Sequence, residues 1–369
     1  SVGGKGGRYL GRGDFSGSGG GIAGIGAAGR LSERGSVTVR EAEEALGYHA
    51  SGRSAAMFEE SYGNPAVVAL NKASSDYHHN ANGGYLTPRG FMLVAGHGEE
   101  DGFAADIAEL DLHKIHIDDA YARGPILNPA SVTMAALHED AQDLDTDRMI
   151  QDFAGVVRGA GGQVITRAEV TAIQHSGSGW QVTAGGRAYE GKQLINAAGA
   201  WVDRIATLAG VAPIGITPKR RSMARLPAPG GHDVTKWPMM MGVGECWYAK
   251  PDAGKLLVSP ADADPVEPHD AFADDMVLAE GLARYEEKVT EPVTRVESNW
   301  AGLRSFVSDG ALVLGADPDR PDFIWCAAQG GYGFQTAPAA SRLLRDLIGG
   351  KTPELDRYII TSLSPERLR

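Results

Sequence analysis

Apolar positions in the first half of the chain alternate between strand-like and helix-like patterns. Short apolar runs predict strands at residues 37–39, 90–94, 164–166, 170–173, 180–183 and 193–196. Apolar residues at helical spacing predict helices at residues 25–34, 65–79 and 145–159. Strands that alternate with helices are typical of an α/β fold with a parallel sheet.

The pattern changes between residues 215 and 300. Short strand-like runs follow one another there, with one predicted helix at residues 275–287, which is typical of an antiparallel sheet. A last buried strand is predicted at residues 323–328, followed by a helix that reaches residue 348. We therefore expect a mostly antiparallel substrate domain beside the α/β domain.

The two domains are expected to be interleaved. The chain has 369 residues, which is too long for one small core, and it contains no extended linker. The predicted boundaries assign residues 1–90, 145–215 and 300–369 to a discontinuous cofactor domain. Residues 91–144 and 216–299 form the predicted substrate domain.

Charge and composition exclude several classes of partner. The net charge of −12 argues against binding to nucleic acid or to an anionic membrane surface. No apolar run is long enough to span a membrane, so we expect no integral membrane segment. The basic N-terminal residues are not followed by an apolar segment, so we expect no signal peptide and a cytoplasmic location.

Candidate metal ligands are sparse. Cys246 and Cys326 are far apart in the sequence, and His113 and His116 have no further ligand at a metal-binding spacing. The sequence therefore predicts neither a metal site nor a disulfide framework.

One cluster of glycines forms a dinucleotide fingerprint. Gly19, Gly21 and Gly24 have the spacing GxGxxG. In this motif the first glycine permits a tight turn, the second lets the backbone approach a pyrophosphate, and the third lets the helix pack on the strand. Glu41 follows about 20 residues later, where an acid would hydrogen-bond the adenosine ribose. These features predict a doubly wound, Rossmann-like domain.

The strand that should precede this fingerprint is unusually polar. Asp14, Ser16, Gly17 and Ser18 occupy positions where a central parallel strand normally carries large apolar residues. The pattern alone predicts a weak strand and gives no physical reason for its polarity.

Two later turns favour a flavin over a nicotinamide. Residues 196–201 (NAAGAW) end a strand in small residues, and residues 330–333 (GGYG) precede the last long helix. The N-terminus of such a helix can stabilise negative charge on a reduced isoalloxazine ring. A nicotinamide dehydrogenase is an alternative on the fingerprint alone, but it leaves the second turn unexplained.

Five segments together resemble the FAD-dependent D-amino-acid oxidase/dehydrogenase family, and among its members they resemble bacterial D-arginine dehydrogenase. They are residues 52–56 (GRSAA), 196–201 (NAAGAW), 218–222 (PKRRS), 300–306 (WAGLRSF) and 328–333 (AQGGYG). The resemblance covers nearly the whole chain from about Gly19. It implies non-covalent FAD and oxidation of a D-amino acid to an imino acid by hydride transfer from Cα to flavin N5.

The resemblance also implies a substrate site. Arg221 and Arg304 match residues near the substrate carboxylate, a task that suits the bidentate guanidinium group. Tyr62, on a mobile lid, and Tyr248 match tyrosines that help to hold the carboxylate. The carbonyl of Gly331 matches one that faces the substrate amine. The predicted FAD contacts are Gly19, Gly21, Ile22, Ala23, Gly24, Glu41, Arg53, Ser54, Ala55, Ala56, Val170, Ala198, Gly199, Trp201, Gly302, Arg304, Gly330, Gly331, Tyr332, Gly333 and Gln335.

Three pocket positions depart from D-arginine dehydrogenase. Phe91 stands where that enzyme has a glutamate that grips the guanidinium, and Met57 stands where it has a histidine; both changes make the pocket more apolar. Glu59 replaces a threonine, and an acid there would restore a cation site opposite a cation–π face of Phe91. The sequence therefore does not decide whether the substrate side chain is cationic or apolar. It also does not decide whether oxygen or a carrier accepts the electrons.

Two other functions are compatible with a bound flavin. One is a flavin amine oxidase of the glycine or sarcosine type, and the other is a flavin-binding protein without turnover. Paired arginines beside paired tyrosines argue against the second, because such a group is suited to holding a carboxylate substrate.

Overall fold

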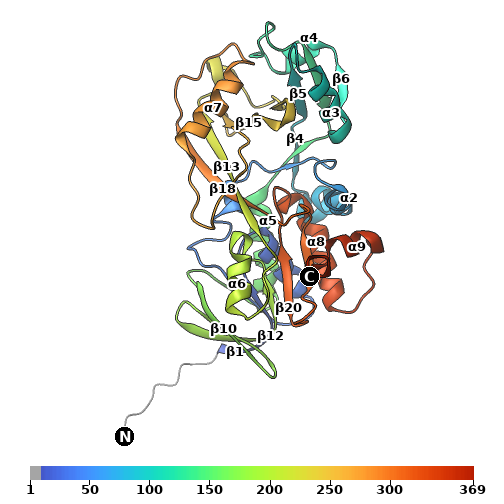
Figure 1. Cartoon of the computed structure of the whole chain (residues 1–369), viewed down its shortest axis with the longest axis vertical. Coiled ribbons are helices and arrows are strands. Elements are labelled where there is room, and N and C mark those ends of the chain that lie inside the picture. The colour runs from blue at the N-terminus through green and yellow to red at the C-terminus, as the bar shows by residue number, and fades with distance from the viewer. Residues whose placement is uncertain (1–9) are drawn as a thin grey trace.

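The computed structural model describes residues 10–369, with side-chain surroundings from residue 13 onward. Residues 1–9, for which we expect no signal peptide, lie outside the described residues. Two large sheets lie one beyond the other along the long axis of the molecule (Figure 1). Strands β13 (Thr217–Leu226) and β18 (Ser298–Phe306) run between the two parts.

The first sheet is doubly wound, as the sequence predicts. Its strands run in the order β10-β11-β12-β1-β2-β9, with β20 beside β12 and β19 beside β20. Pairs among β20, β12, β1, β2 and β9 are parallel, whereas β10, β11 and β19 pair antiparallel. The strands are β1 (Leu10–Ser18), β2 (Val37–Arg40), β9 (Gln163–Ile165), β10 (Val170–Ser176), β11 (Gly179–Ala184), β12 (Arg187–Asn196), β19 (Val313–Ala316) and β20 (Phe323–Ala327).

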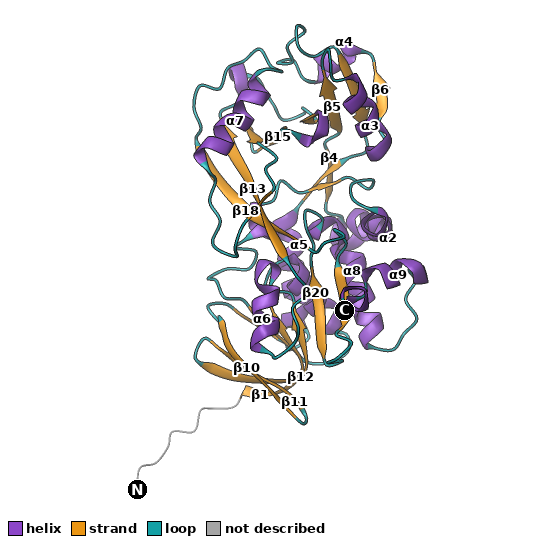
Figure 2. Cartoon of the chain, viewed as in Figure 1, coloured by secondary structure: helices purple, strands orange, loops and turns teal. Residues whose placement is uncertain are grey.

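Helices cover both faces of this sheet (Figure 2). On one face α1 (Ile22–Leu31), α2 (Pro65–Asn80), α5 (Thr146–Gly159) and α8 (Gly333–Ile348) enclose a core that includes Ile25, Phe153 and Leu344. On the other face α6 (Val202–Leu208) and the β10–β11 hairpin enclose a second core around Trp180 and Trp325. Helix α9 (Arg357–Leu363) and the 3-10 turn Pro365–Leu368 close the chain.

The second sheet is mostly antiparallel, as predicted, with the order β17-β13-β16-β15-β14-β5-β7-β6 and β18 beside β13. Among its described pairs only β14 and β5 run parallel. Its other strands are β5 (Phe91–Ala95), β6 (His113–Ile115), β7 (Met134–His138), β14 (Met239–Gly242), β15 (Tyr248–Asp252), β16 (Lys255–Ser259) and β17 (Asp264–Pro265). The helices here are α3 (Glu100–Leu110), α4 (Ile117–Arg123) and α7 (Asp275–Glu286).

A small third sheet joins β3 (Met57–Phe58), β8 (Gln142–Leu144) and β4 (Leu86–Pro88). Short 3-10 turns lie at Ala50–Arg53, Ala81–Gly83, Gly199–Trp201, Pro229–Gly231 and Val243–Glu245. The residue boundaries between the two domains stay a prediction.

Strand β1 is not weak, contrary to its polar pattern. It pairs on both sides, with β2 and with β12. Ser16 and Ser18 are 1% and 2% exposed, and a Cβ added to Gly191 on β12 would lie 2.6 Å from the Cβ of Ser16. The hydroxyl of Ser18 also accepts a hydrogen bond from the buried guanidinium of Arg40 at 3.4 Å. Small residues therefore suit a strand packed this closely, and the polar side chain of Ser18 faces the buried guanidinium of Arg40.

Candidate active site

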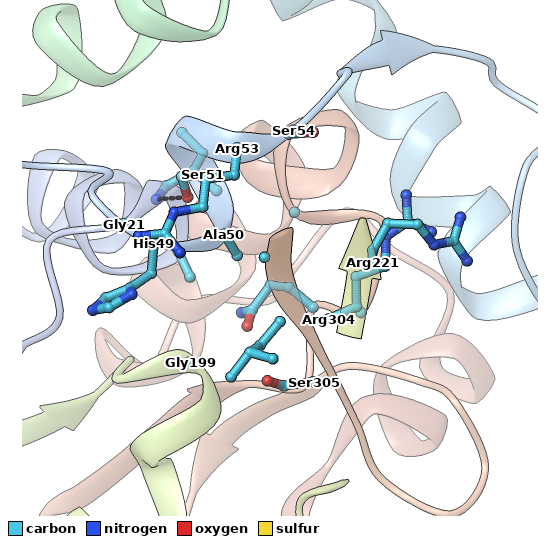
Figure 3. A pocket seen from close by; sticks show the side chains of 18 of the residues that line it. Gly21, His49, Ala50, Ser51, Arg53, Ser54, Gly199, Arg221, Arg304 and Ser305 are labelled. Atoms are coloured by element: carbon cyan, nitrogen blue, oxygen red, sulfur yellow. Dashed lines mark hydrogen bonds between the residues drawn. The ribbon is translucent and has the colours of Figure 1, made fainter. Parts of the chain in front are cut away.

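A cavity of about 640 Å³ is lined by residues of both large sheets. This volume is within the range of small-molecule and cofactor sites. The glycine loop after β1 and the first turn of α1 line one end of it, whereas Arg221 and Arg304 lie at the other end (Figure 3). The two ends have different chemistry.

The loop after β1 forms a cradle that side chains would fill. Gly19 has φ +112°, and a Cβ on Gly24 would lie 1.9 Å from the carbonyl oxygen of Gly19. Helix α1 begins directly at the cavity, with Gly21, which has no side chain to cap it, at the N-cap position and no acid in the first turn. The N–H of Ile22 donates to Oγ of Ser51 at 3.0 Å, which ties the loop to the Ala50–Arg53 turn (Figure 3). An uncapped helix N-terminus of this kind favours a phosphate group.

Glu41 lies at the same end and is fixed by backbone donors. Its Oε2 accepts from the N–H of Gly20 at 2.7 Å, and its Oε1 accepts from the N–H of Glu43 at 3.0 Å. A Cβ on Gly20 would lie 2.9 Å from Oε2, so glycine permits this approach. The carboxylate keeps further lone pairs for a hydroxyl donor in the cavity. The fingerprint spacing did not single out Gly20.

Arg304 lies at the opposite end without a carboxylate partner. Among residues 10–369 its side chain has no hydrogen bond or ion pair, although it lines the cavity. A Cβ on Gly331 would lie 2.8 Å from Nη1 of Arg304, so a glycine at 331 is what lets the guanidinium lie against this backbone. A guanidinium free to pair in a cavity is suited to an anionic ligand.

Arg221 is held more firmly. Its Nε donates to the carbonyl of Asp262 at 2.8 Å, and its Nη1 lies 3.3 Å from Oε1 of Glu245. The guanidinium lies over the ring of Tyr248, 5.8 Å from the centroid. Burial by itself would lower the pKa of Arg221, but Tyr248 and Glu245 raise it. Arg221 therefore stays a cation.

Tyr62 completes this group. Its hydroxyl donates to Oε1 of Glu245 at 3.3 Å, and its ring packs edge-on against Tyr332 with the centroids 5.3 Å apart. Burial raises the pKa of Tyr62 to about 12, so the hydroxyl stays a proton donor at neutral pH. Glu245 was not predicted; it has φ +54°, which is uncommon for a residue other than glycine.

The three departing pocket residues also line the cavity. Oε2 of Glu59 lies 2.6 Å from Nδ1 of His138 on β7, and Oε1 accepts from the N–H of Ser61 at 3.2 Å. The hydrogen bond to Glu59 raises the pKa of His138. Phe91 is buried, and Met57 is partly buried beside it in the same apolar cluster.

Comparison with known proteins supplies the family. A family model described as FAD dependent oxidoreductase (DAO) matches residues 19–347. The chain belongs to the DAO family of FAD dependent oxidoreductases. FAD is therefore the cofactor.

Relatives of this FAD dependent oxidoreductase are distant. FAD-dependent oxidoreductase domain-containing protein 1 of Xenopus laevis is 25% identical over 190 residues, which cover 45% of this chain and only 37% of that protein. Glycine oxidase from Geobacillus kaustophilus matches in fold with a TM-score of 0.81 and 20% identity, over 96% of this chain and 98% of that chain. An L-alpha-glycerophosphate oxidase from Mycoplasma pneumoniae with FAD bound matches with a TM-score of 0.82 and 18% identity, over 94% of this chain and 97% of that chain. At such identity these structures show the shared fold alone.

The cavity of this DAO-family chain fits FAD. The cradle at Gly19 and Gly24 and the open N-terminus of α1 are suited to the pyrophosphate, and Glu41 is suited to the ribose. At the other end the uncapped N-terminus of α8, after Gly330 with φ +56°, opens on the cavity and is suited to the flavin.

Most predicted FAD contacts line this cavity. Gly24 and Tyr332 do not line it, and Arg53 lines it but pairs with other protein groups. Gly24 packs against Gly19, and Tyr332 packs against Tyr62. The guanidinium of Arg53 donates to the carbonyls of Ala271 and Ala301 and pairs with Asp270. Arg53 therefore braces the turn rather than offering a free charge. The roles of all the predicted site residues stay predictions.

Within residues 10–369 no helix is long and apolar enough to cross a membrane. Over the same range no group of three or more His, Cys, Asp or Glu side chains could hold a metal ion.

Proposed function

We propose that this chain oxidises an amino acid at Cα, with FAD as the oxidant. The observation that carries the proposal is the group of Arg304, Arg221, Tyr62 and Tyr248 at one end of the FAD cavity. Two cations and two hydroxyl groups form a site for a carboxylate. Fold neighbours support only part of this, because one is named a glycine oxidase and another a glycerophosphate oxidase.

The two arginines divide the work. Arg304 is free among the described residues and lies against Gly331, so it is the main anchor for the substrate carboxylate. Arg221 already lies beside the carboxylate of Glu245, which supports a role for Arg221 in binding a carboxylate. A substrate held by its carboxylate has few orientations left, and this restriction supplies much of the rate enhancement.

The proposed reaction needs no protein side chain that acts as a base. When bound, FAD accepts the hydride that leaves Cα. The lone pair of the neutral amine forms the C=N bond as the Cα–H bond breaks, giving an iminium carboxylate that water hydrolyses to a 2-oxo acid and ammonium. The protein residues bind and orient the substrate. The arginines hold the carboxylate, the hydroxyl of Tyr62 donates a hydrogen bond to it, and the carbonyl of Gly331 accepts a hydrogen bond from the amine.

The D configuration of the substrate follows from the sequence resemblance and is part of the proposal. An amine oxidase of the glycine type and a flavin-binding protein without turnover are the alternatives. All three are separated by mixing the FAD-loaded protein anaerobically with D- and L-forms of leucine, methionine, phenylalanine, lysine and arginine, and with glycine and sarcosine. Loss of the oxidised flavin absorbance with D-amino acids supports the proposal.

Other outcomes of that experiment reject it in different ways. Reduction by glycine and sarcosine alone would favour the amine oxidase, and reduction by L-amino acids alone would overturn the D configuration. A flavin that stays oxidised with every compound would favour the binding protein. Admission of air to the reduced protein then distinguishes fast reoxidation by oxygen from the need for a carrier.

A further inference from the structure

Four methionines line the cavity next to the carboxylate-binding group. Met57 comes from β3, Met223 from β13, and Met239 and Met241 from β14. They belong to or pack against one apolar cluster that also contains Phe91, Leu110 and Tyr248. We refer to Met57, Met223, Met239 and Met241 as the methionine wall.

Strand geometry places two of these side chains together. Met239 is paired with Phe91 on β5, and Met241 is paired with Tyr248 on β15. Successive strand side chains point to opposite faces, so Met239 and Met241 share a face while Met240 points into a separate core. The wall therefore continues directly from the carboxylate-binding tyrosine.

Of the four acids that line the cavity near this wall, Glu59, Glu245 and Asp106 are already engaged and, among the described residues, Glu109 is not. Glu59 pairs with His138 at 2.6 Å, and Glu245 lies 3.3 Å from Arg221. Asp106 accepts from the N–H of Gly244 at 2.7 Å, and Glu109 is exposed at the rim. Glu59 is 6% exposed, so a second cation would compete with His138 for a desolvated carboxylate.

The energetics separate two classes of substrate side chain. An ammonium or guanidinium group against the wall would lose its water without gaining a free buried acid, because Glu109, which has no partner among the described residues, is exposed to solvent. This loss of water is costly. An apolar substrate side chain has no comparable hydration free energy to lose. Methionine side chains are unbranched and polarisable, and they adapt to ligands of different shape.

We propose that the methionine wall receives the side chain of the substrate and selects amino acids with long apolar side chains over cationic ones. This inference rests on the proposed function, because it places the carboxylate on Arg304 and Arg221. It decides between the two substrate classes that Phe91, Met57 and Glu59 leave open in the sequence.

A matched pair of substrates tests the selection. D-norleucine and D-lysine share the same backbone and the same four-carbon side chain, and lysine carries an additional ammonium group on the terminal carbon. We expect anaerobic flavin reduction to favour D-norleucine by on the order of 100-fold in the ratio of rate to dissociation constant. Equal or faster reduction by D-lysine would overturn the inference but leave the proposed function intact. Reduction by neither, nor by any amino acid, would instead overturn the proposed function.

Binding alone gives a second readout that does not depend on turnover. Hexanoate and 6-aminohexanoate are the corresponding compounds without the α-amine, and each is titrated against the change in flavin absorbance. We expect hexanoate to bind at least about 10-fold more tightly. Tighter binding of 6-aminohexanoate would show a cation site and contradict the inference.

A pair of variants assigns the effect to the wall. Met239→Gln places an amide on the wall, whereas Met134→Gln makes the same change at a partly buried methionine of β7 that packs against the same cluster but does not line the cavity. We expect Met239→Gln to weaken hexanoate binding about 10-fold and Met134→Gln to leave it unchanged, with FAD content measured as the folding check. Equal losses in both variants would mean that the wall does not contact the ligand. If Met239→Gln loses FAD, the hexanoate pair on the unmodified protein decides.

Discussion

At the scale of single residues, Arg304 and Glu245 decide what this site can bind. Arg304 lines the cavity with its charge unpaired among the described residues, whereas Arg221 faces Glu245. The two arginines are similar in sequence context but differ in what they can still bind. Only the structure separates them, because Glu245 comes from a turn that no sequence pattern connects to Arg221.

Replacement of Arg304 by methionine removes the carboxylate anchor that we propose. We expect Arg304→Met to cost about 2–5 kcal/mol in transition-state binding, which is a loss of roughly 30-fold or more in kcat/KM. Arg123→Met is the matched control, because Arg123 pairs with Glu139 and does not line the cavity. The control should keep its kcat/KM; an unaffected Arg304→Met would contradict the assignment.

Glu245 contacts Arg221 and Tyr62, two members of the proposed carboxylate-binding group, so its removal should help a carboxylate ligand. We expect Glu245→Gln to bind hexanoate more tightly by up to about fivefold, because a partly exposed ion pair contributes on the order of 1 kcal/mol or less. The measurement is a titration monitored by flavin absorbance. Weaker binding in this variant would mean that Glu245 supports the ligand instead of competing with it.

At the scale of elements, the glycine loop and α1 form one structural unit with β1. The sequence predicts the turn and the helix of this unit, since the spacing of Gly19, Gly21 and Gly24 identifies both, but it wrongly predicts that β1 is weak. It places the helix start three residues late, at residue 25, because the fingerprint residues before it look like loop; α1 starts at Ile22. It also misses the first half of β12, where polar residues surround Gly191.

Gly24→Ala tests the packing of α1 on β1. The added Cβ would lie 1.9 Å from the carbonyl oxygen of Gly19, so the loop must move and FAD retention should be lost. Gly155→Ala in α5 is the control, because its Cβ would meet nothing within 4 Å. The control should keep FAD and gain up to about 1 kcal/mol in stability. FAD retention in both variants is measured as FAD content after gel filtration. Full FAD retention in Gly24→Ala would contradict the structure of the loop.

The Glu59–His138 pair joins the segment that follows β3 to the end of β7 and should make stability depend on pH. The hydrogen bond to Glu59 raises the pKa of His138 above its unfolded value of about 6.5. A raised histidine pKa stabilises the fold fully below about pH 6.5 and loses this contribution as pH rises through the folded pKa. We therefore expect the Tm difference between the unmodified protein and His138→Gln to be larger at pH 6 than at pH 9. A difference that grows with pH would show that His138 is not held as a cation.

At the scale of the whole molecule, the site exists because two sheets meet around one cavity. The first sheet supplies the glycine loop and Glu41, and the second sheet supplies Arg221, Tyr248 and every methionine of the wall except Met57, which comes from the small third sheet. The sequence predicts both layers from their periodicity. It could not predict that His138 on β7 ties up Glu59, because that contact depends on how β3 and β7 meet in three dimensions.

The central claim is that bound FAD takes hydrogen from Cα of an amino acid. The most direct measurement is anaerobic stopped-flow reduction of the FAD-loaded protein by D-norleucine at saturating concentration, with hydrogen or deuterium at Cα. We predict complete loss of the oxidised flavin absorbance, with a slower rate for the deuterated compound. A flavin that stays oxidised with D-norleucine, and with every other amino acid of either configuration, would contradict the claim.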